Sequence, residues 1–298
     1  VSSGTAALHL GLLALGVGAG QEVIVPSYVC TALLHAVWGA GAEPVVCDSE
    51  PHSGNIDLAG ARRALGRHTA AIIAPHMFGL PAEIEALASL GVPCIEDCAM
   101  SIGANFMGRR LGSFGEISIC SFYATKMLAA GEGGMVLTDS EDLASTVRQL
   151  REYDGAPASR LRFNSKMTDM AAALGRVQLA RLPEFVARRR ALAALYDEAF
   201  AETSLETPLD SLQHIYYRYV VKTGQPASKL IAELEREGVA ARRPIYNPLH
   251  RELRRDDEFF PGATDAHAVD VSLPLYPALK DEEAQQVIAA VCAVAANH

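Results

Sequence analysis

The chain has 298 residues, half of them apolar, and its 26 basic side chains are outnumbered by 35 acidic ones, which gives a formal net charge of -9. This size and apolar content suit one large α/β core with a smaller domain, and an acidic balance without a basic stripe argues against nucleic acid or an anionic membrane as the main partner. No apolar run approaches the roughly 20 residues of a membrane span. The sequence does not open with the pattern of a signal peptide, which is a charged segment followed by an apolar one.

Helix and strand patterns alternate through the first half of the sequence. They predict helices at residues 5–15, 31–38, 58–65, 84–90 and 141–151. They predict strands at residues 22–25, 44–47, 70–75, 93–96, 117–122 and 135–138. Such alternation is typical of a mostly parallel sheet that helices cover on both faces, so we expect an α/β fold.

The second half changes in character. Residues 167–200 form one long helical pattern, which Pro183 should kink or split in two. Three consecutive arginines, 188–190, are interpreted as a solvated face of this helix. A strand and two helices are predicted after it, at residues 216–221, 226–237 and 281–295.

A domain boundary is expected near residue 185, where the composition changes. It divides the chain into a large domain (1–185) and a small C-terminal α/β domain (186–298).

Lys126 ends an apolar run and precedes the glycine-rich turn at residues 131–134. It is one of only five lysines, and the one that lies among Gly, Ser and aromatic residues behind a strand pattern. Partial desolvation at such a position favours the neutral amine, which is the form that makes a Schiff base. Alone, such a lysine is more often a surface residue beside a turn. Its neighbours decide in favour of a cofactor anchor.

Two further features are those that such an anchor needs. Gly4 and Thr5 lie in a Ser/Gly/Thr turn that runs into the first predicted helix, and a helix N-terminus binds anions such as phosphate. Asp97 ends a short apolar run, so it should stand at the carboxyl end of a buried strand, where it could keep a pyridine nitrogen protonated. Each feature can also be read as a plain helix cap. The order of cradle, carboxylate and lysine along the chain favours the functional reading.

These residues lie in motifs that resemble the DegT/DnrJ/StrS family of pyridoxal-phosphate aminotransferases, in family order and over nearly the whole chain. The motifs are SGTAAL (3–8), EDCAMSIGA (96–104), GSFGEISICSFYATK (112–126), GEGG (131–134), FNSKMTDMAAALGRVQL (163–179), YNPLH (246–250) and LPLYP (273–277). The resemblance implies a type I aminotransferase fold, a dimer, and amination of keto groups, mostly on nucleotide-linked sugars. It also implies that some dozens of residues of the large domain would precede SGTAAL.

The same resemblance implies a role for each matching residue. Lys126 would carry the Schiff base to pyridoxal 5′-phosphate (PLP) and then act as general acid and base, while Asp97 would pair with the pyridinium. Three residues would hold the phosphate: Gly4, Thr5 and Ser121. Asn164 would reach across a homodimer interface to the phosphate in the neighbouring subunit.

Two of the cofactor-binding positions depart from the family pattern. Met100 stands where most members have Gln or His near the ring hydroxyl or the substrate. Cys30 stands where many members stack an aromatic residue on the ring, with Tyr28 two residues earlier. A methionine gives a softer, more apolar wall. The acceptor therefore need not be a standard 4-keto-6-deoxy sugar.

Four residues are candidates for substrate contact: His76, Tyr28, Tyr246 and His250. His76 follows the strand predicted at 70–75, at the edge where the cofactor is expected, although a core histidine with satisfied hydrogen bonds is an equally good reading. Tyr246 and His250 lie in residues 239–250, whose two arginines suit a diphosphate or a carboxylate, or simply belong to a surface loop.

The six cysteines lie mostly in apolar, strand-like runs, which predicts reduced core residues of a cytoplasmic protein. Cys94 and Cys98 have no second ligand pair, so no metal site is predicted. The predicted function is PLP-dependent transfer of an amino group from glutamate, or glutamine, to a keto-sugar. Amination of a keto-cyclitol and a PLP-binding regulator without turnover are the alternatives. A related dehydration at C3 uses histidine in place of the lysine, and Lys126 argues against it.

Overall fold

The computed structural model describes residues 1–154, 161–209 and 212–296. Within these ranges, six strands form one sheet in the order β2-β1-β3-β4-β7-β8. The strands are β1 (Glu22–Pro26), β2 (Glu43–Cys47), β3 (Thr69–Pro75), β4 (Cys94–Asp97), β7 (Ile117–Ser121) and β8 (Gly134–Leu137). Neighbouring strands pair in parallel, except that β8 runs antiparallel to β7. The predicted mostly parallel α/β sheet is confirmed.

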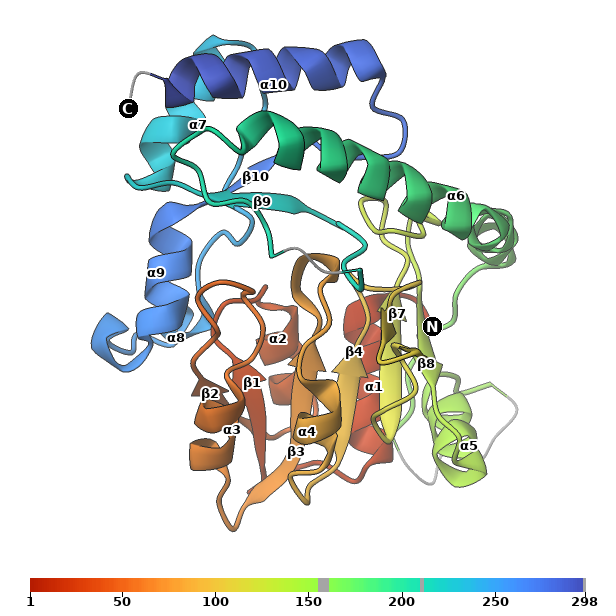
Figure 1. Cartoon of the computed structure of the whole chain (residues 1–298). Coiled ribbons are helices and arrows are strands. Elements are labelled where there is room, and N and C mark those ends of the chain that lie inside the picture. Colours follow the sequence, from red (N-terminus) through yellow and green to blue (C-terminus); the bar gives the residue numbers. More distant parts are fainter. Residues whose placement is uncertain (155–160, 210–211, 297–298) are drawn as a thin grey trace.

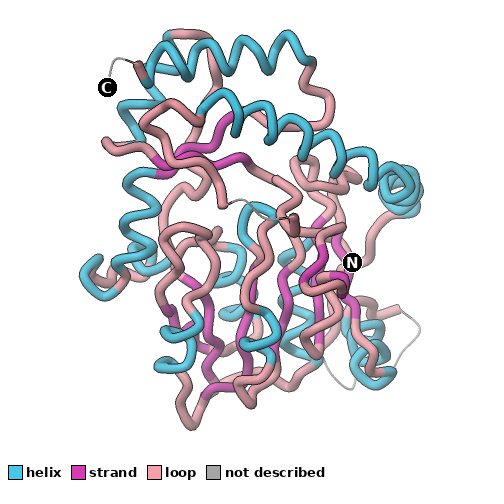
Figure 2. The backbone as a smooth tube through the Cα atoms, in the orientation of Figure 1, coloured by secondary structure: helices cyan, strands magenta, loops and turns pink. Residues whose placement is uncertain are grey.

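Helices cover both faces of this sheet (Figures 1 and 2). One face is covered by α1 (Gly4–Ala14), α2 (Ala32–Gly39) and α5 (Glu141–Leu150), and the other by α3 (Leu58–Ala64) and α4 (Ile84–Ala88). Successive side chains of a strand point to opposite faces of the sheet, so a strand made of apolar residues makes both faces apolar. Val23 and Val25 point into the core under α1 and α2, whereas Ile24 between them packs in the core under α3 and α4.

A second layer lies across the carboxyl ends of the parallel strands (Figure 1). It consists of α6 (Asp169–Phe200), the antiparallel pair β9 (Tyr219–Lys222) and β10 (Asp270–Leu273), α7 (Ala227–Arg236) and α10 (Asp281–Ala295). Tyr196, Tyr219, Leu234 and Val291 belong to a hydrophobic core of its own. Pro183 lies inside α6 without ending it. Figure 1 shows the first turns of α6 end-on and the rest running across the view, so the helix is kinked rather than split.

Short elements complete the chain. A small hairpin pairs β5 (Asn105–Phe106) with β6 (Arg109–Arg110), and α8 (Leu249–Glu252) and α9 (Pro261–Val269) follow the second layer's first strand. Leu249 and Ala263 belong to the hydrophobic core of the large sheet. The C-terminal third of the chain therefore contributes to both cores, and the division into 1–185 and 186–298 stays a prediction. No helix in the described ranges is long and apolar enough to cross a membrane.

Candidate active site

The carboxyl ends of the parallel strands bring several of the predicted residues to one edge of the sheet. Asp97 is the last residue of β4 and Ser121 the last of β7, while Cys30 follows β1 at the start of α2. Open α/β sheets bind ligands at this edge. The side chain of Cys30 is exposed there, within electrostatic reach of both Lys126 and Asp97.

Lys126 stands in a closed loop that leaves β7 and returns to β8. Two backbone hydrogen bonds close this loop, from Ala130 N–H to the Phe122 carbonyl (2.8 Å) and from Phe122 N–H to the Gly133 carbonyl (2.9 Å). The lysine is half-buried, and its Nζ lies 5.0 Å from the centroid of the Tyr217 ring. The amine is thus held against an aromatic face rather than in bulk water.

Asp97 is an almost buried carboxylate, with 6% of its surface exposed. Its Oδ1 accepts a hydrogen bond from Ala99 N–H at 2.9 Å. Burial raises the pKa of the Asp97 carboxyl, and the Ala99 N–H and the Lys126 charge oppose that rise. A carboxylate in this position would be stabilised by a cationic ring nitrogen, so it fits the partner that a pyridinium needs.

The N-terminal turn forms a close-fitting cradle beside the end of β7. Ser3 caps α1 by accepting a hydrogen bond from Ala6 N–H at 3.0 Å, and a Cβ added to Gly4 would lie only 2.8 Å from the Ser121 Cβ. The turn is held on β8, because Val1 and Gly134 exchange backbone hydrogen bonds of 2.8 and 2.9 Å. Thr5 is exposed at the second position of α1. The N-terminus of an eleven-residue helix therefore opens next to the Ser121 hydroxyl, which suits a phosphate.

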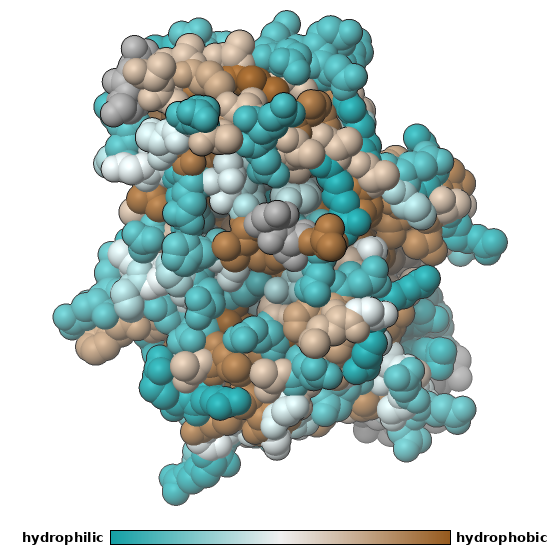
Figure 3. Space-filling view, viewed as in Figure 1, coloured by the Kyte–Doolittle hydropathy of each residue, from teal (hydrophilic) through white to brown (hydrophobic). Residues whose placement is uncertain are grey.

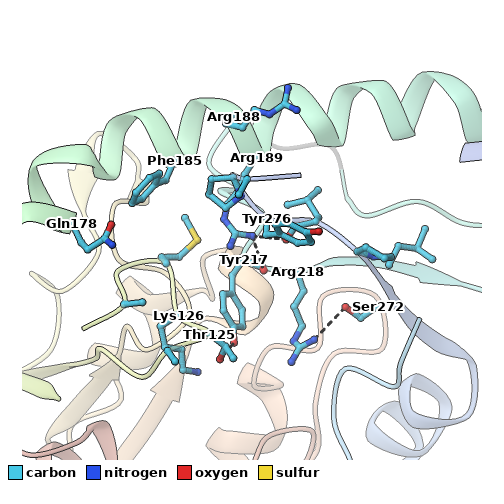
Figure 4. A pocket seen from close by; sticks show the side chains of 18 of the residues that line it. Thr125, Lys126, Gln178, Phe185, Arg188, Arg189, Tyr217, Arg218, Ser272 and Tyr276 are labelled. Carbon is cyan, nitrogen blue, oxygen red and sulfur yellow. Dashed lines mark hydrogen bonds between the residues drawn. The ribbon is translucent and has the colours of Figure 1, made fainter. Parts of the chain in front are cut away.

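Beside Lys126 lies an open pocket of about 850 Å³ between the sheet edge and the second layer (Figure 4). Lys126 and Thr125 form its floor, Tyr217 and Arg218 come from the turn before β9, and Ser272 and Tyr276 come from β10 and the segment after it. This volume is in the range of small-molecule sites. The LPLYP motif at 273–277 is thereby placed in the pocket wall.

Arg189 fastens this wall together, which corrects the interpretation of arginines 188–190 as a solvated face. It is buried, and its Nη1 donates to the carbonyls of Tyr216 (3.0 Å), Tyr217 (3.0 Å) and Leu275 (2.9 Å). Burial lowers the pKa of Arg189 to about 10. One guanidinium therefore links α6, the turn before β9 and the segment after β10.

Sequence analysis did not identify Tyr217 or Arg218, which fell inside a predicted strand at 216–221. The strand begins only at Tyr219, because Tyr216 adopts a left-handed backbone with φ of 51°. This conformation is uncommon for an aromatic residue and turns the chain so that Tyr217 and Arg218 both line the pocket. Across from it, a Cβ added to Gly79 would lie 2.9 Å from the Tyr217 nitrogen. The signal present in the sequence was an arginine beside two tyrosines ahead of an apolar strand.

Tyr217 is almost buried between two cations. Its hydroxyl lies 3.4 Å from Thr125 Oγ1, with Lys126 Nζ and the Arg218 guanidinium both near the ring. Burial acts to raise the pKa of the Tyr217 phenol, but the Lys126 charge and the Thr125 hydroxyl, with two arginines, outweigh it and lower that pKa.

The four predicted substrate residues do not line this pocket. His76 is buried, with Nε2 3.0 Å from Glu96 Oε1 and Nδ1 accepting from Ala82 N–H at 3.0 Å, so both ring nitrogens are engaged. His250 is buried as well, between Ser27 Oγ (2.6 Å) and Asp257 Oδ1 (2.9 Å). In this chain both histidines act as core residues.

The other two candidates, Tyr28 and Tyr246, also lie outside the pocket, and they differ in that one is buried and the other is exposed. Tyr28 is buried under α9, where its hydroxyl donates to the Ala266 carbonyl at 3.3 Å. Tyr246 is 93% exposed on the outer surface. Neither residue is among those that line the pocket beside Lys126.

Met100 lies beside the pocket floor, whereas Asn164 lies on the surface. Met100 is half-buried and packs against the cluster that contains Met127 and Tyr217, which puts an apolar wall beside the pocket floor. Asn164 is exposed next to Ser165, whose carbonyl accepts a hydrogen bond from Ser2 N–H at 2.8 Å. It therefore lies close to Ser2, at the turn before α1.

One group of side chains in the described ranges has the composition of a metal site: His76, Glu96 and Cys98. Their ligand atoms lie within 4.8 Å of one another, but the donors are already engaged. Glu96 accepts from the N–H groups of Gly112 (2.5 Å) and Phe114 (3.0 Å) in addition to His76. The group fastens β3 and β4 to the loop before β7 and is structural.

The sequence matches the DegT/DnrJ/EryC1/StrS aminotransferase family over residues 1–292. The chain belongs to this family. The resemblance identified from the motifs is confirmed, and with it the activity class of the protein, an aminotransferase.

Known members of the DegT/DnrJ/EryC1/StrS family are similar over almost the whole chain. A GDP-perosamine synthase from Caulobacter vibrioides is 33% identical, and the match covers 97% of this chain and 83% of that protein. Among solved structures, DesV of S. venezuelae, in complex with a ketimine intermediate, superposes with a TM-score of 0.93 at 32% identity, covering 99% of this chain and 84% of DesV. The PLP form of Spr1654 from Streptococcus pneumoniae superposes with a TM-score of 0.92 at 26% identity, covering 99% of this chain and 86% of Spr1654. The PLP-dependent aminotransferase fold is thereby confirmed.

Proposed function

We propose that this chain is a PLP-dependent aminotransferase that moves an amino group from glutamate, or glutamine, to a keto-sugar. The observation that carries the proposal is the convergence of a half-buried lysine, a buried carboxylate and a helix N-terminus at one sheet edge beside a large pocket. Solved family members with PLP bound support the choice of cofactor.

The residues present fit this cofactor. Lys126 would bind it covalently through Nζ, and Asp97 would hold a proton on the ring nitrogen. Gly4, Thr5 and Ser121 would receive its phosphate at the start of α1, with Cys30 and Met100 beside the ring. When bound, the cofactor supplies an electron sink, and the protein supplies orientation and charge.

Lys126 has a second role once its amine is released. The neutral amine takes the proton from the Cα of the amino donor and later returns a proton to the substrate carbon that receives the amine. The Tyr217 ring is the surface against which the free amine rests, 5.0 Å from Nζ.

We propose that the acceptor is linked to a nucleotide. The similarity to a GDP-perosamine synthase supports this class. Met100 packs on the cluster of Met127 and Tyr217 beside the pocket floor and adds apolar surface there, which suits a deoxygenated part of the sugar.

We propose that the active enzyme is a homodimer in the cytoplasm. Exposed apolar side chains form a stripe at helical spacing on the first half of α6: Met170 (82% exposed), Leu174 and Val177. Figure 3 shows apolar surface gathered where this part of α6 meets the body of the molecule. Such a stripe is a feature of interfaces, and the exposed Asn164 precedes it in the chain. All six cysteines are free thiols, as expected in a reducing compartment.

The test of the function is covalent trapping. The protein loaded with PLP is reduced with borohydride, digested and analysed by mass spectrometry, and the wild type should carry the reduced cofactor on the Lys126 peptide. Lys126→Ala should carry none and should lack the visible absorbance of the Schiff base, while Lys229→Ala, an exposed lysine on α7, should match the wild type.

A half-reaction separates the enzyme from a regulator that only binds PLP. Glutamate added to the wild type should convert its absorbance to that of the pyridoxamine form. A reduced adduct on another lysine, or no conversion with glutamate or glutamine, would contradict the proposal.

A further inference from the structure

The turn at residues 27–30 leads from β1 toward α2 and ends on the exposed Cys30. Its first three residues are buried, with at most 2% of their surface exposed (Ser27, Tyr28 and Val29). A buried turn keeps its shape only if its polar backbone groups have partners. The groups that hold this turn therefore decide where the Cys30 thiol lies.

Ser27 holds the first turn of α8, although 223 residues separate it from His250. Its carbonyl accepts a hydrogen bond from Leu249 N–H at 2.8 Å, and its Oγ accepts one from His250 N–H at 3.3 Å. The first N–H groups of a helix have no partner within the helix, and Pro248 before α8 supplies no side-chain cap. Ser27 therefore caps α8, and α8 in turn fixes Ser27.

The His250 side chain adds a further point of attachment. Its Nδ1 lies 2.6 Å from Ser27 Oγ, and its Nε2 lies 2.9 Å from Asp257 Oδ1. The ring also stacks on Phe260, with centroids 4.6 Å apart and an angle of 10°. Arg251 binds both carboxylate oxygens of Asp257 and, with His250, keeps the pKa of that carboxyl well below its usual range. A carboxylate only accepts hydrogen bonds, so Nε2 donates to it and Nδ1 is left for Ser27.

Serine, histidine and aspartate in this order are the groups of a hydrolytic triad, but this serine is closed to a substrate. Ser27 and His250 are both buried, with 0% of their surface exposed. A nucleophile has to reach the carbonyl that it attacks. The arrangement is therefore a support for the turn rather than a reactive site.

Tyr28 fastens the same turn to two other segments. Its N–H donates to Ser49 Oγ at 3.0 Å, and its hydroxyl donates to the Ala266 carbonyl of α9 at 3.3 Å. None of these partners of the turn is among the residues that line the pocket beside Lys126. The turn is thus held from outside the pocket, largely by α8 and α9.

We propose that His250 is a positioning residue that acts through Ser27 to hold the Cys30 thiol beside the ring of PLP. This role rests on the proposed function, because Lys126 defines where the ring lies. Without the bond between the Ser27 hydroxyl and the imidazole, the Ser27 carbonyl and the Tyr28 hydroxyl still hold the turn. The fold is kept, and the position of Cys30 is loosened.

Two replacements of similar shape separate positioning from packing. The side-chain amide of asparagine reaches the place of Nδ1 of a histidine, and that of glutamine reaches the place of Nε2. His250→Asn therefore keeps a partner for Ser27, and His250→Gln keeps one for Asp257. Both lose the stacked ring, so both should lose similar stability in urea unfolding. Ser27→Ala removes the hydroxyl itself, and Ser118→Ala, a buried serine on β7 with hydrogen bonds of its own, is the control.

The readout is the rate at which iodoacetamide alkylates Cys30, measured with and without PLP by mass spectrometry of its peptide. PLP bound beside the thiol should slow this rate to the same extent in the wild type, His250→Asn and Ser118→Ala. In Ser27→Ala and His250→Gln, this protection should fall roughly fivefold, which is about the effect of one net hydrogen bond. Alkylation of Cys292, half-buried on α10, reports any general loosening of the fold.

Each contrary outcome has a distinct meaning. Equal protection of Cys30 in every protein would overturn the positioning role. Equal loss of protection in His250→Asn and His250→Gln would assign the imidazole to packing and overturn the role too. If neither of these two variants folds, Ser27→Ala decides, and wild-type protection in it would overturn the role.

The wild type separates this role from the proposed function. A wild type that forms the Schiff base on Lys126 but leaves Cys30 unprotected would place the thiol away from the ring, and would overturn the positioning role while the function stands. A wild type that forms no Schiff base on Lys126 would reject the function itself.

Discussion

The close approach of Gly4 to Ser121 predicts the effect of a single methyl group. In Gly4→Ala the new Cβ would lie 2.8 Å from Ser121 Cβ and 3.1 Å from its Oγ, where ordinary contacts begin at 3.4 Å. Relief needs a shift of about 0.6 Å, and because the Ser121 Cβ is fixed to the backbone of β7, the backbone has to move. Alanine gains at most about 1 kcal/mol in helix propensity, whereas overpacking costs about 1–3 kcal/mol. The strain outweighs the propensity.

The same shift should weaken cofactor binding more than it weakens the fold. Moving the α1 N-terminus away from the Ser121 hydroxyl by 0.6 Å takes a phosphate hydrogen bond from ideal length to the edge of its range. Loss of one such bond costs about 1.5–3 kcal/mol, or roughly ten- to a hundredfold in the dissociation constant for PLP. The assay is a titration of the apoprotein with PLP, followed by the Schiff-base absorbance, together with urea unfolding of the apoprotein.

Gly224→Ala is the matched control, because a Cβ there meets nothing within 4 Å. It should bind PLP as the wild type does. If Gly4→Ala retained wild-type affinity for PLP and matched Gly224→Ala in unfolding free energy, the cradle at the start of α1 would be refuted.

Two further predictions concern Tyr217 and Asp270. Tyr217→Leu should slow the glutamate half-reaction by roughly three- to thirtyfold because Lys126 loses the ring that positions its amine, whereas Tyr217→Phe keeps the ring and should stay near the wild-type rate; equal rates in the two variants would count against this role. Asp270 accepts from Lys222 Nζ at 2.7 Å, and burial raises the pKa of its carboxyl from the ordinary 3.8 to about 6. Since this pKa is raised on folding, its contribution to stability is present below the unfolded value and is lost as the pH rises through about 6. Asp270→Asn should therefore gain on the wild type by up to about 3 kcal/mol between roughly pH 4 and pH 7 in urea unfolding, and parallel curves would exclude the effect.

Much of the fold could be predicted from the sequence because its signals are local. The helix at Asp281–Ala295 matches its predicted bounds, and β7 differs from its predicted range by one residue, since apolar spacing and turn residues act over a few positions. The strand β10 escaped prediction because its partner β9 lies about fifty residues away, and pairing at such a separation has no local signature. The helix α9 was not predicted either, for a related reason, since its apolar residues pack on the distant large sheet.

The candidate site shows the same difference between residues with local sequence signals and residues whose partners are distant in the sequence. Lys126 and Asp97 could be proposed as site residues because their motifs are continuous in sequence, and their roles stay a prediction. His76 and His250 were chosen for their local setting, but their partners Glu96 and Ser27 come from other elements and engage their ring nitrogens. The left-handed backbone at Tyr216, which turns the next two side chains into the pocket, has no sequence signature in a tyrosine.

The three carbonyls held by Arg189 make the far wall of the pocket a single mechanical part. The guanidinium joins the second half of α6 to the turn before β9 and to the segment after β10, and Pro183 provides a bend between that half and the rest of the helix. Any displacement of α6 beyond the bend must therefore move Tyr217 as well, and this changes the distance between its ring and the Lys126 amine. The position of the ring beside the lysine and the position of the segment after β10 are thus set by the same guanidinium.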